Sequence, residues 1–290
     1  MKNNLLALCV LFSFSVSALA QVNNPIVTAV PSLSIAPDAR AGGMGDIGAA
    51  TTPDVNSQYW NPAKYVFMES DAGVSVSYTP WLRKLVTDID LAYLSGYWKF
   101  DQRQALSASL RYFSLGDITL MDQLGIPAGS AHPNEFALDV AYSLLLSEKL
   151  SGSVALRFIN SDLGNGNVGN GVEMYPGRAI AADIAAYYKT PIALQGVDGK
   201  LAFGINISNI GSKISYDQNE TSNFIPTNLR IGGSFDYPID NYNKISVSAD
   251  LNKLLVPTPK LNPTLQDIKS YNDMAPIAGI FNSFSDAPGG

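Results

Sequence analysis

The chain has 290 residues, and 19 Lys and Arg against 25 Asp and Glu give it a net charge of −6, which argues against a nucleic-acid-binding surface. Its single cysteine, Cys9, lies in the first twenty residues, so the rest of the chain can form neither a disulfide nor a thiolate metal site. No run of roughly 18 or more apolar residues follows those twenty, which excludes a membrane-spanning helix there.

Residues 1–20 have the pattern of a secretory signal peptide. Lys2 provides a basic start, Leu5–Val16 is mostly apolar, and Ala18-Leu19-Ala20 forms a small-x-small cleavage site before Gln21. Such a segment is too short and wrongly flanked to be a membrane anchor. We therefore expect a protein that is exported and then cleaved.

Residues 21–70 do not alternate and are predicted to form a segment separate from the strands. Gly43, Gly45 and Gly48 in this segment fit the pattern GxGxxG. A dinucleotide site needs a strand before that motif and a helix opening in it, and neither is evident here. We interpret the glycines instead as positions of tight packing inside a barrel.

Residues 71–290 alternate apolar with small or polar residues, and Glu135 to Leu145 is the clearest stretch. Period-two alternation predicts strands, and an unbroken apolar outer face is typical of a transmembrane β-barrel. The predicted strands are 72–81, 88–100, 104–115, 135–145, 150–161, 178–190, 200–210, 228–236 and 243–252. The fold class is therefore predicted as all-β, an antiparallel barrel in an outer membrane.

The connections between the predicted strands provide a second test. Short links are expected at 101–103, 146–149, 191–199 and 237–242, and longer ones at 82–87, 116–134, 162–177, 211–227 and after 252. Outer-membrane barrels alternate short periplasmic turns with longer outside loops. A soluble β-sandwich is the alternative, and it gives no reason for this alternation.

Charged residues recur at the predicted inward positions of neighbouring strands. They form a predicted lumen charge ladder of Arg111, Asp139, Arg157, Asp183, Arg230 and Asp250. Opposite charges on adjacent strands stabilise a sheet modestly. We expect this ladder to fix strand register or to hold a plug, and unrelated polar lumen residues are the alternative.

Apolar residues in the predicted outer loops are candidates for binding a partner protein, because exposed apolar loop residues often mark interaction sites. The candidates are Leu120, Met121, Met174, Tyr175, Phe224, Ile225, Phe281 and Phe284. Packing within the loops or contact with the membrane interface is the alternative explanation.

Two motifs carry a family resemblance. They are Asp-Ala-Arg-Ala-Gly-Gly-Met-Gly-Asp at 38–46 and Asn-Ser-Gln-Tyr-Trp-Asn-Pro-Ala-Lys at 56–64. The run from Pro31 to Lys64 resembles the PorV family, FadL-like outer-membrane proteins of the type IX secretion system, and the likeness continues along essentially the whole chain after residue 20. We call the most characteristic residues of these two motifs the hatch motif, after the N-terminal hatch that the family has inside its barrel. They are Asp38, Arg40, Gly42, Gly43, Gly45, Asn61, Pro62 and Ala63.

The resemblance implies a FadL-type barrel of about fourteen strands with an N-terminal hatch folded into the lumen. Residues 36–64 would form that hatch. Nine predicted strands and the ending Gly289-Gly290 lead us to expect a chain that is truncated at its C-terminus.

The resemblance also implies a role without catalysis. A family member takes cargo proteins from an SprA-like translocon by their C-terminal signal domain. It passes them to the surface attachment complex that contains the sortase PorU with PorZ and PorQ. The residues themselves support only an exported barrel in contact with membrane lipid, an occupied lumen and long outer loops.

Two other classes remain open. A FadL-like channel for hydrophobic small molecules predicts an apolar lumen, whereas the inward positions here are rich in Ser, Ala, Asn and charges. A soluble β-protein is disfavoured by the continuous apolar outer faces. We expect no cofactor and no metal site, because no His or Cys cluster has ligand spacing and the one histidine, His132, is expected to be a solvated loop residue.

Overall fold

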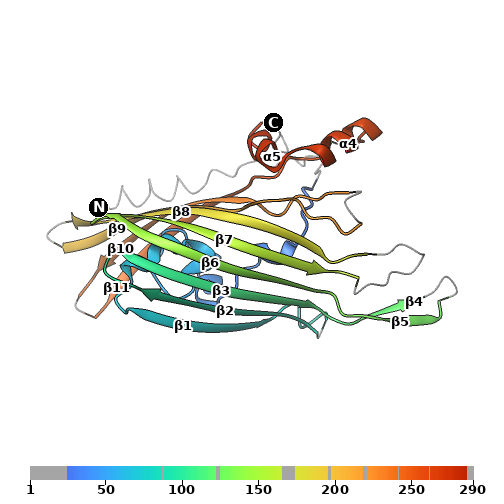
Figure 1. Ribbon diagram of the computed structural model, residues 1–290. Coiled ribbons are helices and arrows are strands. Elements are labelled where there is room, and N and C mark those ends of the chain that lie inside the picture. Colours follow the sequence, from blue (N-terminus) through green and yellow to red (C-terminus); the bar gives the residue numbers. More distant parts are fainter. Residues whose placement is uncertain are drawn as a thin grey trace, which may run out of the picture.

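The computed structural model describes residues 25–86, 88–121, 125–164, 174–194, 197–217, 221–240, 242–260 and 262–285 (Figure 1). The predicted signal peptide, residues 1–20, lies outside these ranges. Nine strands form one antiparallel sheet in the order β1-β2-β3-β6-β7-β8-β9-β10-β11, so that sequence neighbours are also sheet neighbours apart from the inserted β4–β5 pair. The fold is all-β, as predicted, and this sheet is consistent with an antiparallel barrel.

All nine predicted strands are confirmed, with ends that differ by a few residues. They are β1 (Ala72–Pro80), β2 (Ile89–Lys99), β3 (Gln104–Leu115), β6 (Asn134–Ser147), β7 (Leu150–Asp162), β8 (Gly177–Leu194), β9 (Val197–Gly211), β10 (Asn228–Pro238) and β11 (Lys244–Leu254). The expected link 191–199 is wrong in extent, because β8 and β9 continue through most of it. Pairing of Pro191 with Lys200 and of Ile192 with Gly199 extends that hairpin.

On β7, Val154, Leu156 and Phe158 are exposed and the residues between them are buried. Leu156 on β7 is 64% exposed, for example, whereas its neighbour Arg157 is 6% exposed. The same alternation follows β3 and β6, where every second side chain points away from the interior. Because the pleat sends successive side chains to opposite faces, the sheet has an apolar outer face and a small or polar inner face.

The long connections lie at one end of the sheet, which we call the loop end, and the short ones at the other, the turn end. The loop end holds connections 81–88, 116–133, 163–176 and 212–227, and the turn end holds 100–103, 148–149 and 239–243. The loop end contains structure that the sequence did not predict. A hairpin of β4 (Ile118–Met121) and β5 (Pro127–Ala131) projects from the connection between β3 and β6.

Two helices follow β11, where a loop was expected. They are α4 (Leu265–Asp273) and α5 (Pro276–Asn282). Thr264 and Asp267 form a capping box at the start of α4, and Pro276 occupies the first turn of α5. The residues at the start of each helix therefore favour a helix beginning there. In the part of the chain that is described, no helix has the length and apolar character needed to span a membrane.

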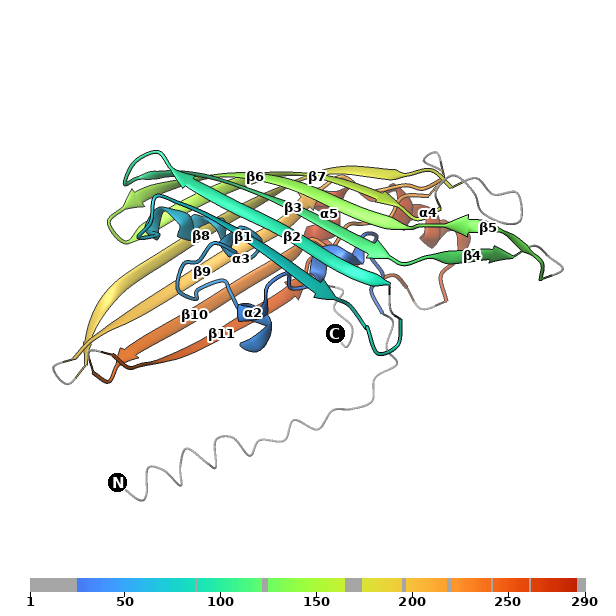
Figure 2. The same ribbon diagram turned by 90° about the horizontal axis from the view of Figure 1, so that it is seen from below.

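Residues 25–71, which we call the N-terminal segment, lie against the concave face of the curved sheet (Figure 2). The segment contains only short helices: η1 (Pro31–Ser34), α2 (Ala39–Gly43), α3 (Ser57–Trp60) and η2 (Pro62–Phe67). Its Val30 and Leu33 pack with Ile159 of β7, and its Tyr65 stacks on Tyr97 of β2 at 4.9 Å. The core of the molecule is therefore the contact between the sheet and this segment.

Candidate functional site

The N-terminal segment keeps its irregular path through side chains that bond its own backbone. Asp38 caps α2, with Oδ1 accepting a bond from the Ala41 amide at 2.9 Å, while Oδ2 accepts a bond from Trp60 Nε1 at 2.7 Å. Asn61 caps η2 by accepting a bond from the Ala63 amide at 3.1 Å. Asn61 also donates a bond to the Ala49 carbonyl at 2.9 Å, so each of these two hatch-motif residues ties together two parts of the segment.

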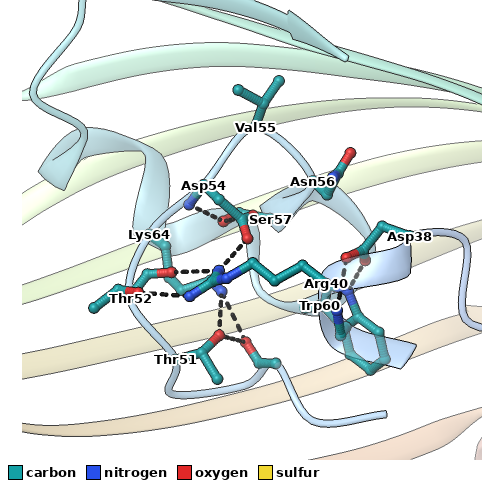
Figure 3. A network of polar contacts seen from close by, with 12 residues as sticks. Asp38, Arg40, Thr51, Thr52, Asp54, Val55, Asn56, Ser57, Trp60 and Lys64 are labelled. Carbon is teal, nitrogen blue, oxygen red and sulfur yellow. Dashed lines mark hydrogen bonds and ion pairs between the residues drawn. The ribbon is translucent and has the colours of Figure 1, made fainter. Parts of the chain in front are cut away.

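Arg40 closes a loop of the same segment (Figure 3). Its guanidinium forms an ion pair with Asp54 and donates bonds to the Thr52 carbonyl at 3.2 Å and to Thr52 Oγ1 at 2.6 Å. Ser57 Oγ in turn donates a bond to Asp54 at 3.2 Å. The loop between α2 and α3 is therefore fixed at several points that lie close together.

Lys64 is a fully buried cation in this segment. Its Nζ donates bonds to the Gly48 carbonyl at 2.8 Å and to Thr51 Oγ1 at 3.3 Å. Burial lowers the pKa of Lys64 to about 8, because the charged form loses its hydration, and Asp54 and Asp250 only partly offset that effect. Sequence reasoning did not single out Lys64, because lysine is rarely buried.

The packing explanation is right for only one of the three glycines in the GxGxxG pattern. A Cβ on Gly48 would lie 2.3 Å from the Trp60 ring, so that glycine is required for close packing. A Cβ on Gly43 or Gly45 would meet no atom within 4 Å, and neither would pack against the sheet. Gly45 is needed for its backbone, which has a φ of +86° just after α2. Gly42 also lacks a close contact, since its Cβ would lie 3.9 Å from Asp46.

Polar side chains of the sheet bind the backbone of this segment at several points. Ser143 of β6 donates a bond to the Pro62 carbonyl at 2.8 Å, and Ser151 of β7 donates one to the Ala63 carbonyl at 2.6 Å. Asn206 of β9 donates a bond to the Trp60 carbonyl at 3.0 Å. In the opposite direction, Asn61 donates a bond to the Ala186 carbonyl of β8 at 3.0 Å.

Glycines on the sheet allow the closest approach. A Cβ on Gly204 of β9 would lie 1.9 Å from the Ala49 carbonyl oxygen. A Cβ on Gly232 of β10 would lie 2.9 Å from the Ala49 Cβ and 2.1 Å from Asp250 Oδ1. Ala49 of the N-terminal segment therefore lies directly against two strands.

Half of the predicted charge ladder contacts the N-terminal segment instead of a neighbouring charge. Arg111 lies opposite Ala137, not Asp139, and donates bonds to the Ser32 carbonyl at 2.5 Å and the Ile35 carbonyl at 2.9 Å. Its guanidinium also lies 4.9 Å from the centre of the Tyr59 ring. A cation–π contact of this kind stabilises a buried guanidinium that has no carboxylate partner.

Arg230 and Asp250 are likewise not brought together. Register places Arg230 opposite Asn252, which accepts its bond at 3.0 Å, and the guanidinium lies 4.6 Å from the Trp60 ring centre. Asp250 Oδ2 accepts bonds from the Gly48 amide at 2.7 Å and the Ala49 amide at 2.9 Å. Residue type alone could not reveal that backbone amides would be the partners.

The other half of the ladder forms one buried cluster. Arg157 lies directly opposite Asp139 and bonds it at 2.5 and 3.1 Å, and it bonds Asp183 at 3.0 Å. Asn209 completes the cluster by accepting a bond from Arg157 and donating its amide to Asp183 at 2.8 Å. Asn209 has a φ of +60° next to the register shift between β8 and β9, a bulge that the period-two pattern could not reveal.

A cavity of about 200 Å³ remains between the N-terminal segment and the sheet. Its lining includes Tyr59, Trp60, Arg157, Asn209, Arg230 and Asn252. The guanidinium and amide groups of this set share the lining with the apolar side chains of Leu33, Ala36, Pro226 and Leu254. The cavity is therefore mixed in character, unlike the wholly apolar pocket that a channel for hydrophobic molecules needs.

The candidate partner-binding residues divide into exposed and buried ones. Met121, Tyr175, Phe281 and Phe284 are exposed at the loop end, and Met174 is half-buried. Leu120 lies on β4. Phe224 and Ile225 are 5% and 2% exposed, so the expectation that they are exposed loop residues is wrong.

Phe224 and Ile225 are buried because the α4–α5 region covers their loop. Phe224 contacts Tyr271 of α4 edge-on at 5.3 Å, and Ile225 joins the core cluster with Val30. Lys213 fixes α4 by donating bonds to the Tyr271 and Asn272 carbonyls, both at 2.8 Å. Cations favour the negative end of a helix, which explains this contact.

The one histidine is an exposed loop residue, as expected, and it contacts one carboxylate. His132 Nδ1 lies 2.6 Å from Asp117 Oδ1 on the opposite side of the β4–β5 hairpin, although both side chains are largely exposed. Within the described ranges, no group of three or more His, Cys, Asp or Glu side chains is arranged to hold a metal ion.

Comparison with protein families gives one match. Residues 18–261, most of the chain, match the type IX secretion system protein PorV. A search of curated proteins finds no match. The matched range includes the N-terminal segment, every strand of the large sheet and the residues that join them. The chain therefore belongs to the PorV family of type IX secretion system proteins.

Proposed function

We propose that this chain receives cargo proteins from an SprA-like translocon through their C-terminal signal domain. It then delivers them to the surface attachment complex with the sortase PorU, PorZ and PorQ, and it catalyses no reaction. The observation that carries the proposal is the match of residues 18–261 to PorV. An integral position in the outer membrane, reached with a cleaved signal peptide, is part of the same proposal.

The geometry supports a role in binding proteins over one in conducting small molecules. Every strand of the sheet except β1 has a hydrogen bond to the N-terminal segment. The contacts come from Lys99, Arg111, Ser143, Ser151, Ala186, Asn206, Arg230 and Asp250. A channel for hydrophobic molecules would require this segment to leave its place, because these hydrogen bonds hold it across the inner face of the sheet.

The charged inward residues have a role in this proposal. Arg111 and Asp250 hold the N-terminal segment as a hatch, and Arg157 with its two aspartates fixes the register of the strands beneath it. A fixed interior leaves the loop end as the surface that a cargo protein contacts.

The loop end offers exposed apolar side chains on a well-anchored support. Phe281 on α5 is 71% exposed and Phe284 is 57% exposed, while α5 packs on Phe224 through Gly279, where a Cβ would lie 2.8 Å from the Phe224 ring. Exposed aromatic residues on a rigid support are typical of protein-binding surfaces. We propose that these two phenylalanines contact the translocon or the cargo.

Affinity purification from outer membranes tests the proposal. The tagged full chain is expected to recover a very large translocon barrel, or secreted proteins that share a C-terminal domain. The double variant Phe281→Ser, Phe284→Ser is expected to recover less of these partners. Tyr242→Ser, which removes a 95% exposed aromatic residue at the turn end, is the matched control and is expected to recover them fully.

Two outcomes would contradict the proposal. Recovery of the protein alone with bound fatty acid would favour the FadL-like channel. If the phenylalanine variant and the control recover equal amounts of the partners, the two phenylalanines are not part of the contact surface.

A further inference from the structure

A second cavity, of about 410 Å³, lies at the turn end of the sheet and plays no part in the proposed cargo role. Its floor is formed by the end of the N-terminal segment, and its wall by β8 to β11. Three lysines line it, each from a different strand: Lys189 of β8, Lys200 of β9 and Lys244 of β11. We propose that this cavity binds a phosphate group.

Register places the three lysines on the same face of the sheet. Lys189 lies opposite Ala202, two residues from Lys200, so the two lysines are diagonal neighbours. Diagonal neighbours on one face lie about 7–8 Å apart, within reach of each other for long side chains. Like charges at such positions destabilise a sheet unless an anion lies between them, so an anion between Lys189 and Lys200 would stabilise this corner.

The carboxylates of the lining offset only part of the charge of these lysines. Glu69 and Asp236 are the two acidic residues of the lining, against three lysines. Asp236 lies directly opposite Lys200 in register, yet among the described residues its only ion pair is with Lys244 at 3.7 Å. The side chain of Asp236 is mostly buried, and its Oδ1 is buried without a hydrogen-bond partner.

Lys189 is held in a way that leaves its ammonium group available. Its Nζ lies 4.2 Å from the centre of the Phe67 ring, and Phe67 packs on Tyr187 at 5.6 Å. A cation–π contact orients an ammonium group without consuming its hydrogen-bond donors. The aromatic pair therefore directs one donor-rich cation into the cavity.

The chemistry of this lining favours phosphate over a carboxylate. A phosphate monoester has up to two negative charges and three free oxygens, and a diester has one charge and two free oxygens, which ammonium groups on different strands can share. Lysine binds phosphate as a point charge and does not need the fixed geometry of a guanidinium. Such a group has two sources, free phosphate-bearing molecules and lipid headgroups.

Titration of the full chain with inorganic phosphate in a phosphate-free nonionic detergent tests the site. We expect saturable binding with a Kd of about 1 mM or tighter. The double variant Lys189→Gln, Lys200→Gln should weaken binding about tenfold for each lysine lost. Lys149→Gln removes an exposed lysine at the same turn end but outside the cavity, and it should bind as the unaltered chain does.

A variant that is expected to strengthen phosphate binding keeps the test decisive if the double variant fails to fold. Asp236→Asn removes a negative charge from the lining and should tighten phosphate binding severalfold. Absence of saturable binding to the unaltered chain would overturn the proposal. Equal affinity in the unaltered chain, the double variant and Asp236→Asn would overturn it as well.

A competition arm distinguishes the two sources of phosphate. Phosphatidylglycerol or the matching diacylglycerol is added to the detergent micelles. If phosphatidylglycerol displaces phosphate and diacylglycerol does not, the site binds a lipid headgroup. If neither lipid displaces phosphate, the site binds a free phosphate-bearing molecule. Displacement by the diacylglycerol, which has no phosphate, would contradict the proposal.

Discussion

Replacing Asp250 with alanine should release the N-terminal segment locally. Oδ2 of this side chain accepts bonds from the Gly48 and Ala49 amides at 2.7 and 2.9 Å. A hydrogen bond to a charged group contributes about 1.5–3 kcal/mol, and because Asp250 is only half-buried we take the lower value for each bond. The loss is then about 3 kcal/mol, which corresponds to roughly hundredfold easier opening at these two amides.

Hydrogen exchange measured by mass spectrometry is the direct assay. Peptides that contain residues 48 and 49 should exchange about a hundredfold faster in Asp250→Ala, whereas strand amides of β6 and β7 should keep their protection. Asp250→Asn keeps one acceptor oxygen without the charge and should give a smaller increase.

Asp240 provides a matched control. Its carboxylate also accepts bonds from two successive amides, those of Tyr242 and Asn243, both at 2.7 Å, but on an exposed turn. Asp240→Ala should leave the exchange of residues 48 and 49 unchanged. If Asp250→Ala also leaves it unchanged, the two bonds do not hold the segment and the reasoning is refuted.

Further predictions concern the interior. Asp139→Arg should destabilise the folded sheet more than Asp139→Asn in urea or thermal unfolding, because it places a second guanidinium opposite Arg157; equal melting would contradict this. Gly204→Ala should cost several kcal/mol in the same assay, since its Cβ would lie 1.9 Å from a carbonyl oxygen, whereas Gly233→Ala, whose nearest neighbour lies 3.7 Å away, should cost little. Because the pKa of Lys64 is about 8 when folded and 10.5 when unfolded, the unfolded chain binds more protons between these values. Stability should therefore rise by up to about 3 kcal/mol as pH increases from 8 to 10.5, and Lys64→Met should abolish that rise.

Strand positions were readable from the sequence because period-two alternation reflects a physical constraint. Leu138 and Val140 must face outward if Asp139 faces inward. Once one pair of residues on two neighbouring strands is aligned, the pairing of all the other residues on those strands follows. The same pattern could not predict α4 and α5, whose short helices follow the last strand without a long amphipathic repeat. It also failed between 191 and 199, where a link was expected although Pro191 and Ile192 pair with β9.

The six charged residues of the predicted ladder lie on the inner face, but the predicted partners are right only for Asp139, Arg157 and Asp183. Asp139 and Arg157 are close because both belong to regular strands with a predictable register. Arg111 and Asp250 instead bind carbonyl and amide groups of the N-terminal segment. Every residue has such backbone groups, so the sequence does not show which of them will be a partner. Burial of Lys64 was equally hidden, since its acceptors are mostly main-chain and hydroxyl oxygens.

The contact between Gly48 and Asp250 has a consequence for the timing of folding. These residues are 202 positions apart in the chain, and the contact between Asn61 and Ala186 spans 125. Contacts between distant positions form slowly, because a long stretch of chain must first be ordered. The N-terminal segment therefore cannot dock completely before β11 is in place. Until then its carbonyl and amide groups need water or a chaperone as temporary partners.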